Sequence, residues 1–277
     1  MLIGTHTYAA EGEGLRRQTA GVASLLALRD AGAVNVQFAQ RPHHVEGLRT
    51  LDVLQRASTD IDPRGPRKPI VSEIFDALAA EAAVRGCAYI CFTNADVIVS
   101  QQAVDWILGE DRDAFLLSRE DFDGVTGAAS GMQLGGIDTI AIRGAWWTRN
   151  RRRFRPYIVG ETAWDNVYAA ILMIHGNGVI ENRRPLIRHE MHDAGRGSAF
   201  AEYTRLLSAL DAFYFTRWCC YWWPLMKLRE QGAAAAEEAA LARSVFSRRQ
   251  SAVESAVQAG RSAKARVRYA WWRVSRA

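Results

Sequence analysis

Cysteine is scarce in this chain of 277 residues, whose four cysteines are Cys87, Cys91, Cys219 and Cys220. They form neither a Cys-x-x-Cys spacing nor a paired framework, so the sequence favours a reducing compartment and argues against a thiolate zinc site. No apolar run reaches the ~18 residues that a membrane span needs. The first residues also lack the basic leader and the long apolar stretch of a signal peptide. We therefore expect a cytoplasmic protein without a transmembrane helix.

Most of the chain carries nearly equal numbers of acidic and basic residues. The formal net charge is +5, but residues 225–277 carry 11 Lys or Arg against 4 Asp or Glu, a local +7, which leaves −2 for the rest. This balance argues against a nucleic-acid-binding protein. Apolar residues make up 49% and charged residues 23% of the chain, which is typical of a soluble globular protein with a sizeable core.

The stretch from Tyr89 to Val99 is the most informative apolar segment. It consists of an aromatic and β-branched run, a polar turn at Asn94-Ala95-Asp96 and a second apolar run. Such a short run predicts a buried central strand. Residues that follow a central strand lie at the edge where open α/β sheets bind ligands. Asn94 and Asp96 are therefore candidates for holding a divalent cation with a diphosphate, although both residue types also favour plain turns.

Strand and helix patterns alternate along the first part of the chain, and the pattern is helical from Ser198 onwards. Strands are predicted at residues 2–5, 34–38, 89–93, 114–117, 137–142, 179–181 and 186–187, and helices at 15–31, 70–85, 101–108 and 162–175. A strand, helix, strand order predicts right-handed crossovers and a parallel sheet. We therefore predict an α/β fold with a mostly parallel central sheet flanked by helices over residues 1–195, and a C-terminal helical region over residues 196–277.

Two segments have the composition of loops. Residues 58–69 hold three of the seven prolines and several basic residues, which indicates either a solvated linker or a lid that contacts phosphate. Residues 124–136 are rich in Gly, Ala and Ser without a helical or strand period. We expect this second segment to be a mobile loop.

Glu161 and Asp165 are a candidate pair of catalytic acids. They lie one helical turn apart at the start of the predicted helix 162–175, so both carboxylates can face the same side. Such a pair can deprotonate a hydroxyl nucleophile if one acid is left unpaired. The alternative is that Thr162-x-x-Asp165 forms a capping box. Asp138, a single acid near the start of the predicted strand 137–142, is a further candidate.

His189 and His192 are candidate metal ligands. Each could supply a nitrogen to a divalent ion, with Glu190 or Asp193 orienting the rings. Because their spacing is not that of a helical zinc motif, a surface histidine pair is the alternative interpretation.

Two basic segments stand out. The run at 149–155 includes Arg153 and is either a solvated face or an electrostatic funnel for an anionic substrate. Residues 260–277 contain no acid and interleave basic residues with Tyr269, Trp271 and Trp272. This second pattern suits peripheral contact with an anionic membrane, or packing of a tail helix on the protein or on a partner.

In this order the segments resemble the GT-A-type nucleotide-sugar glycosyltransferases, and in particular small bacterial proteins linked to cell-surface polysaccharides. The likeness covers about residues 1–195. It rests on the strand 2–5, on Asn94-Ala95-Asp96 in the place of the family's Asp-x-Asp, on Gly136-x-Asp138, on Gly160-Glu161 with Trp164-Asp165-Asn166, and on the pair His189 and His192.

The resemblance implies roles for the matched residues. Asp165 would be the catalytic base of an inverting transfer, Asp138 would lie near the sugar or the acceptor, and Thr5 near the nucleotide base. Asp96, with His189 or His192, would bind Mn²⁺ or Mg²⁺ on the donor diphosphate. The candidate site residues are catalytic Asp165, Glu161 and Asp138; donor-binding Thr5, Asn94, Asp96 and Arg153; and metal-binding Asp96, His189 and His192. Asn94 stands in the place of the first family acid, which puts the metal requirement in question.

The resulting hypothesis is a glycosyltransferase that moves a sugar from a nucleotide-diphosphate donor to a hydroxyl acceptor, a glycan or a lipid-linked one, in cell-surface polysaccharide synthesis at the inner face of the membrane. One alternative is a non-catalytic sugar-binding or scaffold protein of an envelope-assembly complex. Another is a metal-dependent phosphoesterase that uses Asp96, Asp138 and the histidines, but too few acids cluster in the sequence for a two-metal site. Nucleotide, sugar, acceptor and a homo-oligomeric state stay open.

Overall fold

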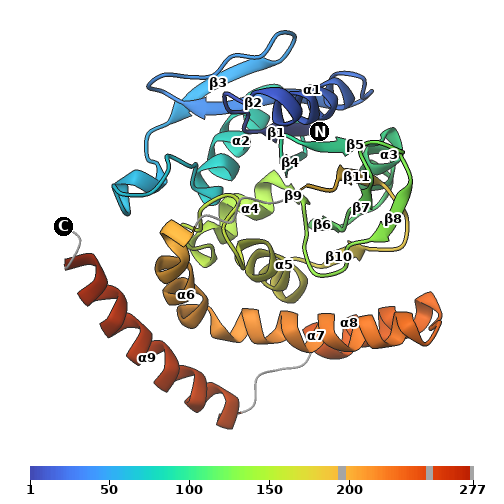
Figure 1. Cartoon of the computed structure of the whole chain (residues 1–277). Helices are drawn as coiled ribbons and strands as arrows, with labels where there is room; N and C mark the ends of the chain where they lie inside the picture. The colour runs from blue at the N-terminus through green and yellow to red at the C-terminus, as the bar shows by residue number, and fades with distance from the viewer. Residues whose placement is uncertain (193–197, 248–251, 275–277) are drawn as a thin grey trace.

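A seven-stranded sheet forms the centre of the computed structural model, which describes residues 1–192, 198–247 and 252–274 (Figure 1). In spatial order its strands are β10 (Gly178–Glu181), β6 (Ala114–Leu117), β9 (Thr139–Arg143), β4 (Tyr89–Thr93), β1 (Leu2–Thr5), β2 (Gly32–Phe38) and β3 (Arg49–Leu54). All run parallel except β9, which is antiparallel to both of its neighbours. The predicted α/β class with a mostly parallel sheet is confirmed.

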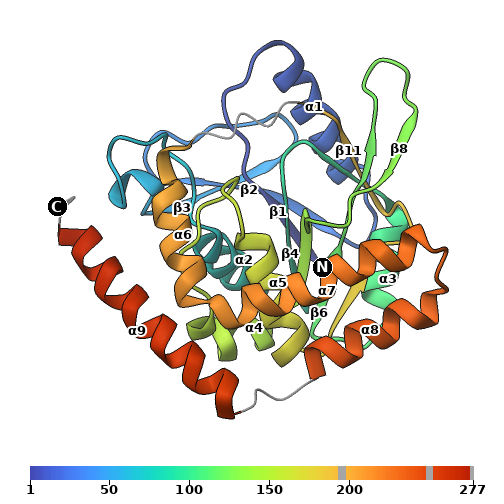
Figure 2. The same cartoon turned by 60° about the horizontal axis from the view of Figure 1, so that its bottom comes forward.

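Helices cover both faces of this sheet (Figures 1 and 2). On one face lie α2 (Val71–Arg85), α4 (Gly144–Asn150) and α5 (Trp164–His175), and on the other α1 (Gly12–Leu26) and α3 (Gln101–Gly109). Alternate residues of a strand contribute to the cores on opposite faces of the sheet. Leu116 of β6 belongs to the core beneath α2, α4 and α5, and Phe115 to the core beneath α1 and α3. Because both faces are covered, β4 and β6 are buried at every position, which explains their continuous apolar sequences.

A second sheet of four short strands lies beyond the carboxyl ends of β4 and β6. Its order is β5 (Val97–Val99), β11 (Ile187–Glu190), β7 (Glu120–Phe122) and β8 (Ala129–Met132). Strands β7 and β8 form a hairpin in which Glu120 pairs with Met132. The expectation of a mobile loop over 124–136 is therefore wrong for β8. Its small side chains carry no alternating pattern, but its backbone pairs with β7.

Most other differences from the prediction concern the ends of elements. Helix α1 begins and ends earlier than expected, and β2 begins at Gly32, two residues before the predicted start of that strand. The edge strand β3 was not predicted. Short 3-10 helices occupy 58–60, 151–153 and 198–200. Ser100 accepts a hydrogen bond from the Ala103 N–H at 3.3 Å and so caps α3, as residue preference at helix starts suggests.

The C-terminal part is helical, as predicted. It consists of α6 (Ala201–Leu210), α7 (Ala212–Glu230), α8 (Ala235–Ser247) and α9 (Ala252–Val274). Helix α7 packs on α5, and α9 packs on α6. Trp218 of α7 and Trp272 of α9 belong to the same buried cluster as the strand residue Ile140. Within the described ranges, no helix has both the length and the apolar character needed to cross a membrane.

Candidate active site

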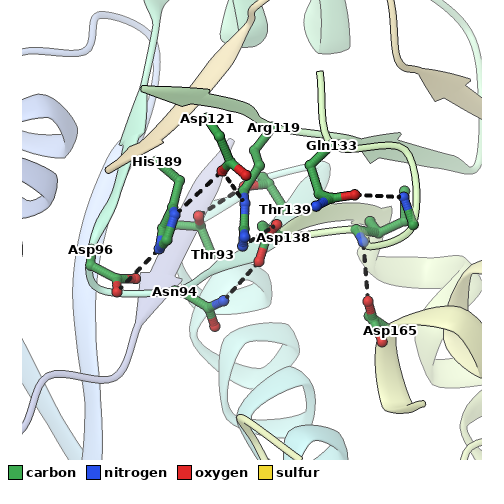
Figure 3. A network of polar contacts seen from close by, with 12 residues as sticks. Thr93, Asn94, Asp96, Arg119, Asp121, Gln133, Asp138, Thr139, Asp165 and His189 are labelled. Atoms are coloured by element: carbon green, nitrogen blue, oxygen red, sulfur yellow. Dashed lines mark hydrogen bonds and ion pairs between the residues drawn. The ribbon is translucent and has the colours of Figure 1, made fainter. Parts of the chain in front are cut away.

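Three strand ends meet at the carboxyl edge of the large sheet. Because β9 is antiparallel, its first residue Thr139 pairs with Thr93 at the end of β4 and with Leu117 at the end of β6. The residues just outside these ends, Asn94 and Asp138, therefore lie side by side (Figure 3). The topology thus brings together two of the residues singled out from the sequence.

Asp138 is held by a network of polar contacts. Its Oδ1 accepts a hydrogen bond from Asn94 Nδ2 at 3.2 Å, and its Oδ2 accepts one from Arg119 Nη1 at 3.0 Å (Figure 3). The Arg119 Nε donates to Asp121 Oδ1 at 2.7 Å. Burial raises the pKa of Asp138, and the Arg119 charge opposes this shift. Asp138 is thus a partly buried carboxylate whose two oxygens already have partners.

Asp96, His189 and His192 form a compact group. Asp96 Oδ2 lies 3.1 Å from His192 Nε2 and 3.5 Å from His189 Nε2. One ligand atom from each residue can be chosen so that all lie within 4.8 Å of one another, and among the described residues this is the one such group of three potential metal ligands. Burial alone would raise the pKa of Asp96, but the contacts with both histidines outweigh it and lower the pKa to about 2.

The second sheet positions these histidines. Strand β11 pairs with β5 so that His189 lies opposite Val97, one residue beyond Asp96. The His189 Nδ1 lies 3.5 Å from Asp121 Oδ1 on the neighbouring strand β7. A carboxylate on the second ring nitrogen orients a histidine ligand. Glu190, one expected orienter, pairs instead with Arg16 and Arg17 of α1, and Asp193, the other, lies outside the described residues.

Sequence reasoning missed Arg119 and Asp121. Asp121 lies beside His189 of the group Asp96, His189 and His192, and Arg119 contacts both Asp121 and Asp138. Arg119 and Asp121 therefore connect that group to Asp138. A signal was present, because both lie within four residues after the predicted strand 114–117, at the sheet edge where open α/β sheets bind ligands.

Asp165 lies in the first turn of α5 and is not a helix cap. The N-cap position is Ala163, with φ of 73° and no side-chain hydrogen bond, so the capping box starting at Thr162 does not form. Asp165 Oδ2 instead accepts a hydrogen bond from the Ile137 N–H at 3.1 Å (Figure 3). A Cβ on Gly136 would lie 3.2 Å from this oxygen, so glycine permits the close approach.

The environment of Asp165 differs from that of Asp138. Burial raises the pKa of Asp165 to about 6; the Ile137 N–H opposes the shift and the negative charge of Asp138 adds to it. No ion pair to Asp165 occurs in the described part of the chain. A carboxylate with a pKa near neutrality and no cationic partner has the properties of a general base.

The remaining candidates lie in different places. Glu161 has a side chain only 7% exposed that pairs with Lys68 Nζ at 2.7 Å, so of the two acids one helical turn apart, Asp165 is the unpaired one. Thr5 ends β1 at the same edge of the sheet as Asn94 and is fully buried. Its hydroxyl has no hydrogen-bond partner among the described residues.

Arg153 is not at this edge. Strand β9 runs away from the site, because Arg143 at its end pairs with Tyr89 at the start of β4, so α4 and the 3-10 helix 151–153 begin at the opposite edge. There the Arg153 Nε donates to Asn150 Oδ1 at 3.1 Å, and Arg151 pairs with Asp76. This placement corrects the interpretation of 149–155 as a funnel leading to the site.

A mostly parallel sheet with one reversed strand, and acids and histidines gathered at its carboxyl edge, form a GT-A-like fold. A comparison with solved structures agrees: the chain is similar to Staphylococcus aureus TarS residues 1–349 in complex with UDP-GlcNAc, with a TM-score of 0.52 and 12% identity, covering 79% of this chain and 71% of that one. The same protein with UDP gives a TM-score of 0.48 and 11% identity over 79% and 71%.

The apo glycosyltransferase GlyE of Streptococcus pneumoniae also matches, with a TM-score of 0.34 and 11% identity over 69% of this chain and 54% of that one. No protein-family model and no curated protein matches the chain. At 12% identity the similarity to TarS establishes the fold, and the activity has to be argued from the site.

Proposed function

We propose that this chain is a glycosyltransferase that moves a sugar from a nucleotide-diphosphate donor to a hydroxyl acceptor, with inversion at the sugar carbon. The observation that carries the proposal is Asp165, a carboxylate without an ion-pair partner and with a raised pKa. It lies at the same sheet edge as Asp96 and His189 (Figure 3), which together with His192 form the group of potential metal ligands. Activation of a hydroxyl acceptor requires a general base close to the site that holds the donor diphosphate, and Asp165 meets this requirement.

Asp96, His189 and His192 are the residues that would hold a divalent ion. Two imidazole nitrogens and one carboxylate oxygen fit Mn²⁺ better than Mg²⁺, because Mg²⁺ prefers oxygen ligands alone. Bound there, such an ion would neutralise charge on the departing diphosphate. Asn94 adds no negative charge, and its amide is engaged by Asp138, so metal affinity depends on the histidines more than in a site with two acids.

The chain's own residues supply the remaining chemistry. The acceptor oxygen attacks the anomeric carbon, the bond to the diphosphate breaks with its electrons leaving on the diphosphate, and Asp165 takes the acceptor proton. Its raised pKa makes it a better proton acceptor than an ordinary aspartate. Asp138, held by Arg119 and Asn94, is assigned to orienting the sugar or the acceptor. Glu161 is assigned a supporting role, because Lys68 neutralises it.

The biological setting is part of the same proposal. UDP-GlcNAc in the TarS complex makes uridine-diphosphate sugars the first donors to test, with Thr5 near the base. We assign the acceptor to cell-surface polysaccharides or their lipid-linked precursors and the reaction to the cytoplasm, which the sparse use of cysteine supports. Residues 1–195 would bind the donor and catalyse the transfer, followed by the helical region 196–277, although the boundary itself lies outside the described residues.

Thermal denaturation with a panel of nucleotide sugars, with and without Mn²⁺, tests donor binding. A ligand at a hundredfold excess over its Kd stabilises the folded state by about 2.7 kcal/mol. The donor found in this way then serves in a transfer assay. Asp165→Asn should lower the transfer rate by on the order of 10²–10⁴-fold while calorimetry shows unchanged donor binding. Asp96→Ala should instead weaken binding that depends on Mn²⁺.

The pH profile provides an independent check. Because Asp165 must be ionised to accept a proton and its pKa is about 6, kcat/KM of the wild type should fall about tenfold per pH unit below that value. Wild-type transfer by Asp165→Asn would exclude the base assignment. Donor binding without transfer or hydrolysis would favour the non-catalytic alternative, which the replacement of a family acid by Asn94 also suggests.

A further inference from the structure

Helix α9 has one face in the core and one face in solvent. Ala265 and Trp272 are buried, and the Trp272 ring packs against Tyr203 of α6 with ring centroids 5.3 Å apart. On the outer side, Val267 is 70% and Trp271 is 68% exposed. Both views show α9 along the rim of the molecule with no element beyond it (Figures 1 and 2). The packing interpretation of the basic aromatic tail therefore explains Trp272 but not Trp271.

A groove of about 230 Å³ lies between α9 and α6. Its apolar floor and its cationic rim come from both helices and from the first residue of α7. The lining residues are Arg205, Leu206, Ala209, Ala212, Lys264, Ala265 and Arg268. None of these residues is acidic, and no ion pair to Arg205, Lys264 or Arg268 occurs in the described part of the chain. Three exposed cations thus surround a small apolar hollow.

The groove and the exposed apolar residues belong to one continuous surface. Lys264, Arg268 and Trp271 recur at helical intervals of four and three residues, and Val267 and Trp271 are four residues apart, so they share one side of α9. Cations that flank an exposed tryptophan and valine match the boundary of an anionic bilayer, where phosphates lie beside the apolar interior. A soluble anion would leave Trp271 and Val267 without a role.

We propose that this surface, formed by Arg205, Lys264, Arg268, Val267 and Trp271, docks the protein onto a bilayer of anionic lipids. The groove holds a lipid phosphate, while Trp271 and Val267 enter the region between headgroups and acyl chains. Helix α9 lies along the membrane rather than across it, consistent with its polar composition and with its buried inner face. The proposal does not depend on the glycosyltransferase assignment. Residues 275–277 of the basic tail lie outside the described residues.

Co-sedimentation of the full chain with vesicles tests this surface. Vesicles of phosphatidylcholine mixed with phosphatidylglycerol should bind the protein, and vesicles of phosphatidylcholine alone should bind it much less. Each cation near an anionic membrane strengthens partitioning roughly fivefold. The triple variant Arg205→Gln, Lys264→Gln and Arg268→Gln should therefore partition on the order of a hundredfold more weakly. Trp271→Ala should weaken binding without changing its dependence on salt, because it removes apolar contact only.

The matched control removes the same charge elsewhere. Arg29→Gln, Arg41→Gln and Arg49→Gln neutralise three exposed arginines near the ends of α1 and β2 and at the start of β3, elements that lie away from α9 (Figure 1), and should retain nearly all of the binding. Circular dichroism of each variant verifies folding. If both triple variants lost the same amount of vesicle binding, the binding would depend only on the net charge of the protein, and the proposal would be overturned. Saturable calorimetric binding of inorganic phosphate without vesicle binding would also overturn it, because the groove would then be a soluble-anion site.

Discussion

Arg119 is the residue on which the two halves of the site depend. Its guanidinium lies between Asp138 and Asp121, at 3.0 and 2.7 Å, and Asp121 in turn faces His189. Without this cation, two partly buried carboxylates would lie close together with little compensation. Removing one partner of a buried ion pair is costly because the other charge stays behind.

Arg119→Met should destabilise the fold by about 2–4 kcal/mol, somewhat less than for a fully buried pair because the side chain is 23% exposed. Arg188→Met is the matched control, since Arg188 pairs with Glu120 but is 39% exposed, and it should cost at most about 1 kcal/mol. Urea unfolding measures both. Adding Asp138→Asn to Arg119→Met should recover part of the loss, whereas strictly additive effects would refute the coupling.

The residues that the sequence identified share one property: each adjoins a strongly patterned segment. Asp96 follows a buried apolar strand and Asp138 precedes one, so the edge of the sheet could be anticipated from apolar runs alone. Asp121 belongs to the short strand β7 and Arg119 immediately precedes it; the register of β7 depends on β11, nearly seventy residues later. Such long-range pairing leaves no local periodicity. Arg153 was misplaced for a related reason, because nothing local indicates that β9 is reversed.

At the scale of elements, α1 lies close against the turn that carries Asp96. A Cβ on Gly21 would lie 2.2 Å from the Ala95 carbonyl oxygen and 3.1 Å from that of Val97. These are backbone atoms, so they cannot move aside without displacing the turn, whereas the end of a flexible side chain could. Helix α1 therefore fixes the position of the Asn94-Ala95-Asp96 turn through this single glycine.

Gly21→Ala should destabilise the protein by about 1–3 kcal/mol, because the helix or the turn must move to accept the methyl group. It should also weaken donor binding that depends on Mn²⁺, by displacing Asp96. Gly14→Ala in the same helix is the control, since its nearest neighbour would be the Ala10 Cβ at 3.5 Å. That change should stabilise the helix by up to about 1 kcal/mol. Thermal unfolding compares the two, and equal effects would show that the turn is not clamped.

At the scale of the whole molecule, the C-terminal helices and the sheet share one core. Val167 and Ile171 of α5 belong to the same buried cluster as Trp218 and Leu225 of α7, and α5 also carries Asp165. Residues 1–195 without these helices would expose an apolar face of the helix that bears the proposed base. The α/β part and the C-terminal helical part are thus linked energetically through this shared core.

Hydrogen exchange should report this link. The most protected amides of β4 and of α7 should exchange with the same opening free energy, because a shared core opens as one cooperative unit. Mass spectrometry of peptides from both elements provides the comparison across increasing urea. If residues 196–277 formed an independent domain, α7 would exchange through a separate opening at lower urea concentration, and the two free energies would differ.

Strand β8 is an exposed edge strand, and its shape affects whether two copies of the protein can associate through this edge. It is the outermost strand of the small sheet, and its residues are mostly exposed. Its pairing with β7 is irregular next to Asp121, and Gly131 adopts φ of 104°. Irregular, kinked borders resist the addition of a foreign strand. The margin beside the candidate site is thereby protected against edge-to-edge aggregation with a second copy of the chain.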